Sequence, residues 1–376
     1  MLEHVLKERL KSIDGAGLRR KLENYTLHES IAGRRVHTDH EEELLSFSCD
    51  DYMGLSTHEL VKQAATDAVN LYGVGARASR ISTGNHTMYA ELEEKLAKMH
   101  NTESALVFSS GYLATIGCIS SLVGHRDMIL TDRMAHPSLL DGAKLCGAEI
   151  YQFDHNDVTH CDKLMNQYRK SHENCLLLVE NVYGMSGNIA PVAELHALAK
   201  HWNSWIAIDT AHGFGMFSTQ QPDVYIGTLS KTLGSLGGYI CGSKTVTEYL
   251  LNTANSLVGT TALPPSVVAA ASTALDLCQS QLGIPIRFAR EFCQTLELPE
   301  PQSHIVTLIM KTNQSALNAV QSLVRNGMLV SAICTPIVPS PRLRFAFTAT
   351  HKLIDIHRLC SVLKREGILS DCIVSS

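Results

Sequence analysis

Residues 205–215 read WIAIDTAHGFG, and residues 224–238 read VYIGTLSKTLGSLGG. Each stretch opens with an apolar run of the length of one buried β-strand and continues into small and polar residues. Asp209 ends the first strand, and Lys231 follows the second. Ligands of open α/β sheets bind outside the carboxyl ends of the strands, so we expect Asp209 and Lys231 to lie together at that edge.

The same pattern extends outward on both sides. Further short strands are expected at 45–49, 105–108, 128–130, 150–153, 176–179 and 238–241, and helices at 59–72, 88–100, 112–122, from 137 and at 191–202. Short apolar strands alternating with helices predict an α/β fold with a mostly parallel sheet covered on both faces. After about residue 280, strands at 304–310, 328–334 and 342–347 with helices at 314–326 and from 352 predict a small α+β domain.

These patterns predict four parts of the chain. Residues 1–45 form an N-terminal helical segment, in which apolar residues recur at helical spacing from Leu2 to Ile13. Residues 46–250 form the large domain, residues 251–280 a connecting helix, and residues 281–376 the small C-terminal domain.

Composition narrows the class of protein. The 376 residues carry a formal net charge of −5 and have a pI of about 6.4, and neither suggests a nucleic-acid partner, which would normally need a clustered basic face. The eleven cysteines include no CxxC pair, which argues against a disulfide framework or a metal site and favours a reducing compartment. No apolar stretch reaches the ~18 residues of a membrane span, and the N-terminus does not resemble a signal peptide. We therefore expect a cytoplasmic protein.

Lys231 is unusual for a surface lysine because small residues and hydroxyls surround it. Small neighbours leave space for a planar ring, hydroxyls bind phosphate oxygens, and a lysine amine in such a place can form a Schiff base. Asp209 could then pair with a pyridinium nitrogen. Each residue also has a structural interpretation: Lys231 as an exposed lysine in a glycine-rich turn, and Asp209 as a helix N-cap.

Together, IDTAHGFG (208–215) and TLSKTLGSLGG (228–238) resemble the α-oxoamine synthases, which are fold-type-I pyridoxal-phosphate (PLP) enzymes. Other matching motifs are FSCDDYMGLS (47–56), GVGARASRISTG (73–84), FSSGYLAT (108–115), DRMAHPSLLDGA (132–143), TTALPP (260–265) and RLRFAFTATH (342–351). The resemblance implies a PLP-dependent acyltransferase that works as a homodimer with shared active sites. FDHNDVTH (153–160), LRRKL (18–22) and the 336–351 segment resemble the members that join L-alanine to a pimeloyl thioester of CoA or a carrier protein.

The resemblance also assigns roles at the cofactor. Lys231 would bind PLP covalently and later act as general acid and base, and Asp209 would pair with the ring nitrogen. His212 would hydrogen-bond near the ring oxygen or the keto-acid intermediate, and His136 would stack on the ring. The remaining cofactor contacts would come from Gly111, Tyr112, Thr228 and, from a partner subunit, Thr261.

Four residues are assigned to the substrates. Arg344 would bind the amino-acid carboxylate as a bidentate fork. Asp50 would lie near the same substrate, and Arg19 and Thr348 would contact the acyl chain. The structural interpretations are that Arg19 is surface charge and that His136 caps a turn. Of Arg342 and Arg344, one is expected to face solvent.

The chain departs from the family pattern at several positions. Asp50 replaces the usual asparagine, and a carboxylate only accepts hydrogen bonds, whereas an amide also donates them. Gly184 stands where a cofactor-binding serine is expected, so Gly184→Ser is predicted to tighten cofactor binding. Ser186 replaces an aspartate, Tyr89 a histidine, and Arg77 a small residue.

Three alternatives remain open. A sister synthase would use glycine or serine instead of alanine. A catalytically silent subunit would bind a partner synthase, which Asp50 and Gly184 favour and Lys231 opposes. A dinucleotide-binding oxidoreductase would need a GxGxxG motif after an early strand, and the sequence has none there.

Overall fold

The computed structural model describes residues 1–15, 19, 22, 24–27, 34–38, 43–217 and 221–373. Residues 18, 20 and 21 of the LRRKL motif therefore lie outside the described residues. Within the described ranges, no helix combines the length and the apolar character needed to cross a membrane.

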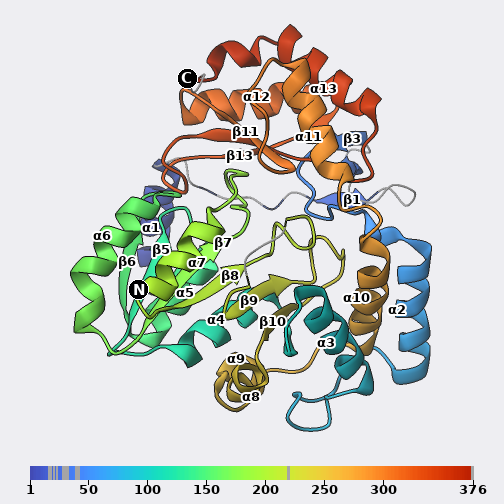
Figure 1. Ribbon diagram of the computed structural model, residues 1–376. Helices are drawn as coiled ribbons and strands as arrows, with labels where there is room; N and C mark the ends of the chain where they lie inside the picture. The colour runs from blue at the N-terminus through green and yellow to red at the C-terminus, as the bar shows by residue number, and fades with distance from the viewer. Residues whose placement is uncertain are drawn as a thin grey trace.

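A seven-stranded sheet forms the centre of the molecule (Figure 1). Its strands follow the order β4 (Ser104–Phe108), β10 (Gly238–Gly242), β9 (Val224–Thr228), β8 (Trp205–Asp209), β7 (Cys175–Glu180), β5 (Met128–Asp132) and β6 (Glu149–Phe153). Strand β10 runs antiparallel to both of its neighbours, and the pairs from β9 to β6 are parallel. The predicted mostly parallel sheet is confirmed.

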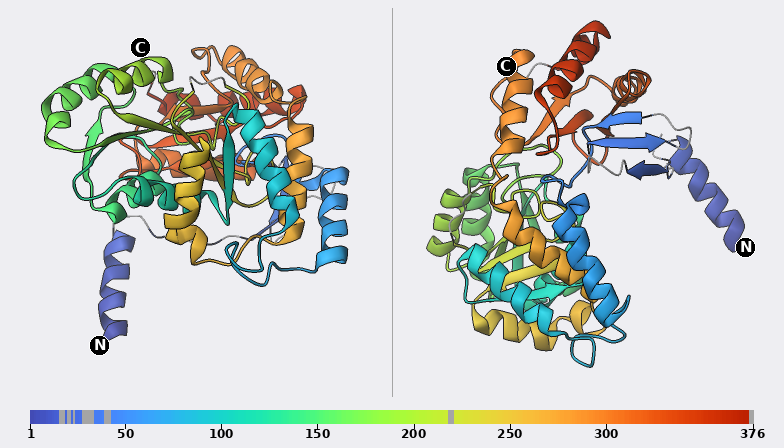
Figure 2. Two further views of the ribbon diagram at one scale, coloured as in Figure 1. Left: turned by 60° about the horizontal axis from the view of Figure 1, so that its bottom comes forward. Right: turned by 90° about the vertical axis from the view of Figure 1, so that its right-hand side faces the viewer.

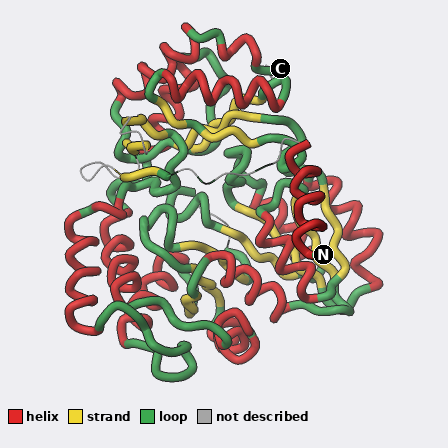
Figure 3. Tube along the Cα trace, turned by 180° about the vertical axis from the view of Figure 1, so that it is seen from behind, coloured by secondary structure: helices red, strands yellow, loops and turns green. Residues whose placement is uncertain are grey.

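Helices cover both faces because the strands are apolar on both faces. In β7, Leu176 and Leu178 pack into one cluster with α4 and α5, while Leu177 and Val179 pack into another with α6 and α7. One face carries α2 (Glu59–Tyr72), α3 (Thr87–His100), α6 (Val158–Tyr168), α7 (Val192–His201) and α10 (Pro265–Cys278). The other carries α4 (Gly111–Leu122), α5 (Pro137–Cys146), α8 (Lys244–Thr253) and α9 (Asn255–Val258). Seen from behind, the strands run between these helical layers (Figure 3).

The C-terminal part lies above the carboxyl ends of the central strands (Figure 1). Its antiparallel sheet has the order β11 (Ile305–Ile309), β14 (Arg342–Ala346) and β13 (Ser331–Ile333). It packs with α11 (Ile284–Thr295), α12 (Asn313–Arg325) and α13 (Leu353–Arg365) around a separate apolar cluster.

The N-terminal segment contains strands as well as the expected helix. Helix α1 (Leu2–Gly15) has no buried residue and extends away from the rest of the molecule (Figure 2). A four-stranded sheet follows, in the order β1 (Tyr25–Leu27), β2 (Arg35–Thr38), β3 (Glu43–Ser46) and β12 (Met328–Leu329).

The chain after β3 runs along β14 and thereby reaches the centre of the molecule. The N–H of Ala346 donates to the carbonyl of Phe47 at 2.8 Å, and the N–H of Ala349 donates to the carbonyl of Tyr52 at 2.7 Å. These bonds place Asp50 beside Arg344, from which it is 294 residues distant in sequence.

Candidate active site

A cavity of about 220 Å³ opens at the carboxyl ends of β7, β8 and β9. Its walls include most of the residues that the sequence assigned to the cofactor: Gly111, Tyr112, His136, Asp209, His212, Thr228 and Lys231. The structure therefore brings these residues to one place, although they come from different elements of the sheet and its helices.

Lys231 and His212 contact each other directly in this cavity. Lys231 Nζ lies 2.8 Å from His212 Nε2, and the other ring nitrogen, Nδ1, lies 2.6 Å from the hydroxyl of Tyr52. Burial, and next the charge of Lys231, hold the pKa of His212 well below its ordinary value. A neutral His212 can accept a hydrogen bond from Lys231 and donate one to Tyr52. Tyr52 was not predicted as a site residue, because nothing local in the sequence indicates a contact across 160 residues.

Two buried carboxyl groups end neighbouring strands of the sheet. Asp209 on β8 is paired in register with Glu180 on β7, and Asp209 Oδ1 accepts the N–H of Ala211 at 2.8 Å. Burial, and next the nearby Asp209, raise the pKa of Glu180 from 4.5 to about 8. Burial also raises the pKa of Asp209, against the opposing charge of Lys231. Glu180 was not predicted, although it follows an apolar strand as Asp209 does.

The opposite end of the cavity has the donors of an anion site. Helix α4 begins at Gly111 after the N-cap residue Ser110, and free N–H groups at a helix start favour a phosphate. Thr228 Oγ1 lies 2.8 Å from Ser230 Oγ, and both residues line the cavity. A Cβ atom at Gly111 would lie 3.1 Å from Thr228 Cβ, so glycine permits the close approach of helix and strand. The hydroxyl of Tyr112 donates to Asp141 at 2.8 Å.

His136 lines the cavity and also caps a helix. Its Nδ1 accepts the N–H of Ser138 at 3.2 Å at the start of α5, and the backbone N–H of His136 donates to Glu180 Oε1 at 2.6 Å. His136 therefore caps a helix, as the turn-cap interpretation has it, and also lines the cavity.

Arg344 lies behind Tyr52 and is held by the large domain. Its Nη2 donates to Asp50 Oδ1 at 3.0 Å, and its Nε donates to the carbonyl of Gly184 at 2.6 Å. The expectation that Arg342 or Arg344 faces solvent is wrong: both are buried, with 7% and 8% exposure. Residues i and i+2 of a strand lie on the same face, and the whole of β14 is buried.

The surroundings of Gly184 argue against the prediction that a serine would tighten cofactor binding. A Cβ atom at Gly184 would lie only 2.2 Å from His212 Nε2, so a larger residue there would displace the ring. Of the other departures, Ser186 Oγ accepts the N–H of Asn188 at 3.3 Å within the same turn. Tyr89 is a core residue at 1% exposure, and Arg77 has a φ of 67° in a loop.

Five predicted residues do not line the cavity: Asp50 and Arg344, which form the pair described above, and Arg19, Thr261 and Thr348. Arg19 is exposed and pairs with Asp14 at 3.4 Å. Thr348 is fully buried, and its hydroxyl lies 2.7 Å from that of Thr350. Thr261 is exposed, and its carbonyl accepts the hydroxyl of Ser109 at 2.9 Å. The predicted contacts of these last three with the acyl chain and the partner's cofactor stay predictions.

The residues of the cavity fit PLP. A lysine amine, a buried carboxyl group and a helix start with hydroxyls match the aldehyde, the ring nitrogen and the phosphate of this cofactor. Among the described residues, no three histidine, cysteine or acidic side chains come together as metal ligands.

Comparison with known proteins identifies the family. Residues 42–363 match the family "Aminotransferase class I and II". The chain is 41% identical to an 8-amino-7-oxononanoate synthase of Methylorubrum populi, over 96% of this chain and 94% of the relative. A serine palmitoyltransferase of Sphingomonas wittichii superposes with a TM-score of 0.88 at 28% identity, covering 96% of both chains. A serine palmitoyltransferase solved with PLP superposes with a TM-score of 0.86 at 26% identity, covering 97% of this chain and 98% of the other.

The chain belongs to the aminotransferase class I and II family. Within it, the chain is a PLP-dependent acyltransferase of the α-oxoamine synthase group.

Proposed function

We propose that this enzyme makes 8-amino-7-oxononanoate, a step of biotin biosynthesis, from L-alanine and a pimeloyl thioester. A bond forms between the alanine α-carbon and the thioester carbonyl carbon, the thiol leaves, and the alanine carboxylate leaves as carbon dioxide. The observation that carries this substrate pair is the 41% identity, over almost the whole chain, to a synthase of that name.

The cavity residues have different proposed roles at the cofactor. When bound, PLP withdraws electrons from the substrate's α-carbon and makes its proton acidic. Lys231 would hold the cofactor and move the substrate's α-proton, and His212 Nε2, 2.8 Å from the lysine amine, would accept a hydrogen bond from it. Asp209 would pair with the ring nitrogen, His136 would stack on the ring, and Thr228 with the start of α4 at Gly111 and Tyr112 would hold the phosphate.

Substrate contacts come from the small domain and its surroundings. Arg344 binds the amino-acid carboxylate, and Arg19 and Thr348 are our candidates for the acyl chain. We further propose a homodimer in which Thr261 reaches the phosphate of the partner's site. All eleven cysteines are free thiols, which suits the reducing cytoplasm as the place of the reaction.

A substrate panel tests this proposal. The purified enzyme, loaded with PLP, is offered alanine, glycine or serine with pimeloyl, acetyl, succinyl or palmitoyl thioesters. We expect the highest specificity constant for L-alanine with a pimeloyl thioester, on CoA or on a carrier protein. Glycine should be poorer by roughly 10- to 200-fold, since one methyl group gives only that much discrimination.

The panel also separates the alternatives. Because two of the structural relatives are serine palmitoyltransferases, serine with palmitoyl thioester is the most informative competitor. A higher specificity constant for that pair, or for glycine with acetyl- or succinyl-CoA, would replace the proposed substrates and leave the family unchanged. A protein that binds PLP but turns over none of the pairs would be the silent subunit.

A further inference from the structure

Arg344 already has a carboxylate partner within the protein. Asp50 Oδ1 accepts a hydrogen bond from Arg344 Nη2 at 3.0 Å and a second from the hydroxyl of Tyr52 at 3.1 Å. The side chain of Arg344 is 10% exposed and that of Asp50 is 39% exposed, so the pair is partly shielded from water.

The environment of Asp50 favours its ionised form. Its pKa is lowered despite burial, which acts the other way, because Arg344 and then Lys231 stabilise the carboxylate. At neutral pH the carboxylate therefore neutralises the guanidinium that the substrate's carboxylate would use. An arriving α-carboxylate would have to displace Asp50 or bind beside a like charge, and like charges in contact oppose binding.

The Asp50–Arg344 pair also bears on the stages of the reaction in which no substrate carboxylate is present. The amino acid brings a carboxylate to Arg344, but the product of a decarboxylative condensation has lost it. Asp50 supplies a counter-charge to Arg344 in the states without a substrate carboxylate, before the amino acid binds and after carbon dioxide leaves. An asparagine at this position would have no charge to do so.

We propose that Asp50 is a specificity-determining residue that competes with the amino-acid carboxylate for Arg344. It weakens binding of the carboxylate-bearing substrate and leaves binding of carboxylate-free amines unaffected. This inference rests on the proposed function, in which Arg344 binds the amino acid.

The test measures dissociation constants from the change in absorption of the bound PLP. Two ligands are titrated: L-alanine, and ethylamine, which is alanine without its carboxylate. Asp50→Asn should tighten L-alanine binding by about tenfold or more, the effect of restoring a charged hydrogen bond, and should change ethylamine binding by less than about twofold. Asp50→Ser is a second variant that also removes the charge, should the asparagine variant fold poorly.

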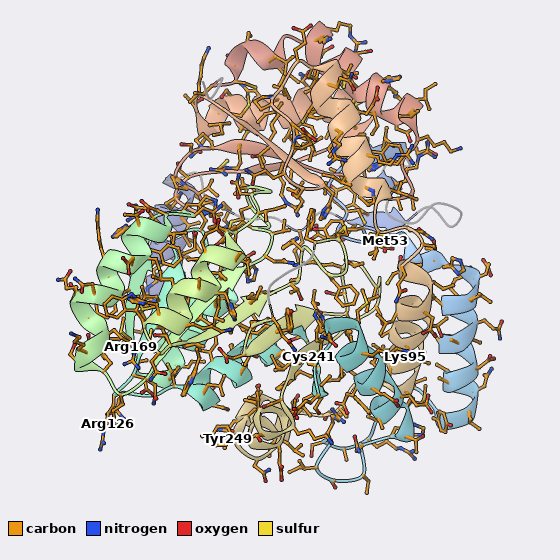
Figure 4. The ribbon with its side chains drawn as sticks, viewed as in Figure 1. Met53, Lys95, Arg126, Arg169, Cys241 and Tyr249 are labelled. Atoms are coloured by element: carbon orange, nitrogen blue, oxygen red, sulfur yellow. The ribbon has the colours of Figure 1, made fainter. Side chains whose placement is uncertain are left out.

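Glu173→Gln is the matched control. It also turns a carboxylate into an amide within an arginine pair, since Glu173 accepts from Arg126 at 2.8 Å. This pair is exposed and lies at the amino ends of the strands, and Arg126 points away from the molecule (Figure 4). The control should leave both dissociation constants unchanged.

A measurement on the unchanged protein gives an independent check. Because Asp50 neutralises Arg344 in the wild type, L-alanine should bind less than about tenfold more tightly than ethylamine. If Arg344 were free to make a charged contact with the carboxylate, L-alanine would bind up to about 150-fold more tightly than ethylamine. Equal L-alanine affinity in the wild type and both Asp50 variants, or an equal gain for ethylamine, would overturn the inference and leave the proposed function standing. If L-alanine perturbs none of the proteins and is not turned over, the proposed function fails, and the inference fails with it.

Discussion

Lys231 Nζ lies 2.8 Å from His212 Nε2, so the lysine proposed to hold the cofactor has a histidine as its direct hydrogen-bond partner. His212 is in turn tied through Nδ1 to the hydroxyl of Tyr52, which also donates to Asp50. This row of contacts joins the cofactor cavity to Arg344 in the small domain. Changes along the row should therefore affect catalysis and amino-acid binding more than stability.

Tyr52→Phe should lower kcat/KM without unfolding the protein. The change removes the hydroxyl 2.6 Å from His212 Nδ1 and leaves a buried ring nitrogen without its partner. We expect a loss of about tenfold or more in kcat/KM for alanine with unchanged PLP absorption. Tyr89→Phe is the control, because it also removes a buried hydroxyl, bonded to Leu263 at 3.1 Å, but lies in the core. Equal activity of the wild type and both variants would contradict a role for Tyr52.

Gly184→Ser should damage the site, contrary to the prediction from the family pattern. The new Cβ would lie 2.2 Å from His212 Nε2, and such overpacking costs about 1–3 kcal/mol or shifts the ring. We expect kcat/KM to fall by about tenfold or more. Gly283→Ser is the control, because a Cβ atom at Gly283 meets no other atom within 4 Å. A serine variant that binds PLP more tightly with full activity would restore the original prediction.

Glu180→Gln should change the pH dependence of stability. The pKa of Glu180 is raised from 4.5 to about 8 in the folded protein, so between these values only the unfolded chain has lost the proton. The wild type then loses stability as pH rises through this window, and a glutamine variant does not. The free energy of unfolding is measured for the cofactor-free wild type and variant at pH 5 and at pH 8. The value for the variant minus the value for the wild type should be larger at pH 8 than at pH 5 by more than about 1 kcal/mol. A difference that stays constant over this range would show that Glu180 does not titrate there.

The proposed homodimer predicts that activity follows assembly. If Thr261 completes the partner's phosphate site, the active species should be a two-fold symmetric dimer. Sedimentation and activity measured over a dilution series should fall together as dimers dissociate. A monomer with full specific activity at the assay concentration would contradict the shared site.

The sequence predicts the central sheet well because its strands carry a local signal. Strands β7 and β8 are apolar up to their last residue, Asp209 ends β8, and Lys231 comes three residues after the end of β9. Helix α11 was not predicted; its stretch of sequence contains Pro285, and a proline inside a helix usually interrupts it. In the structure this proline lies in the first turn of the helix, where no backbone N–H is needed.

The parts of the site that were missed depend on long-range contacts. Tyr52 and Asp50 meet His212 and Arg344 only because the chain after β3 runs along β14. The clash that makes Gly184 necessary involves a ring 28 positions away on another strand end, and no spacing in the sequence indicates it. Glu180 could have been predicted, because it ends an apolar strand in the same way as Asp209.

The most direct test of the account is to locate the cofactor on the chain. The PLP-loaded protein is reduced with borohydride, which makes the bond between a lysine amine and the cofactor irreversible. The protein is then digested, and the masses of its peptides are measured by mass spectrometry. We predict that the added mass lies on Lys231 and that Lys231→Ala, still folded, carries no such mass and has no activity. Labelling of another lysine, or full activity of Lys231→Ala, would contradict the assignment of this cavity as the active site.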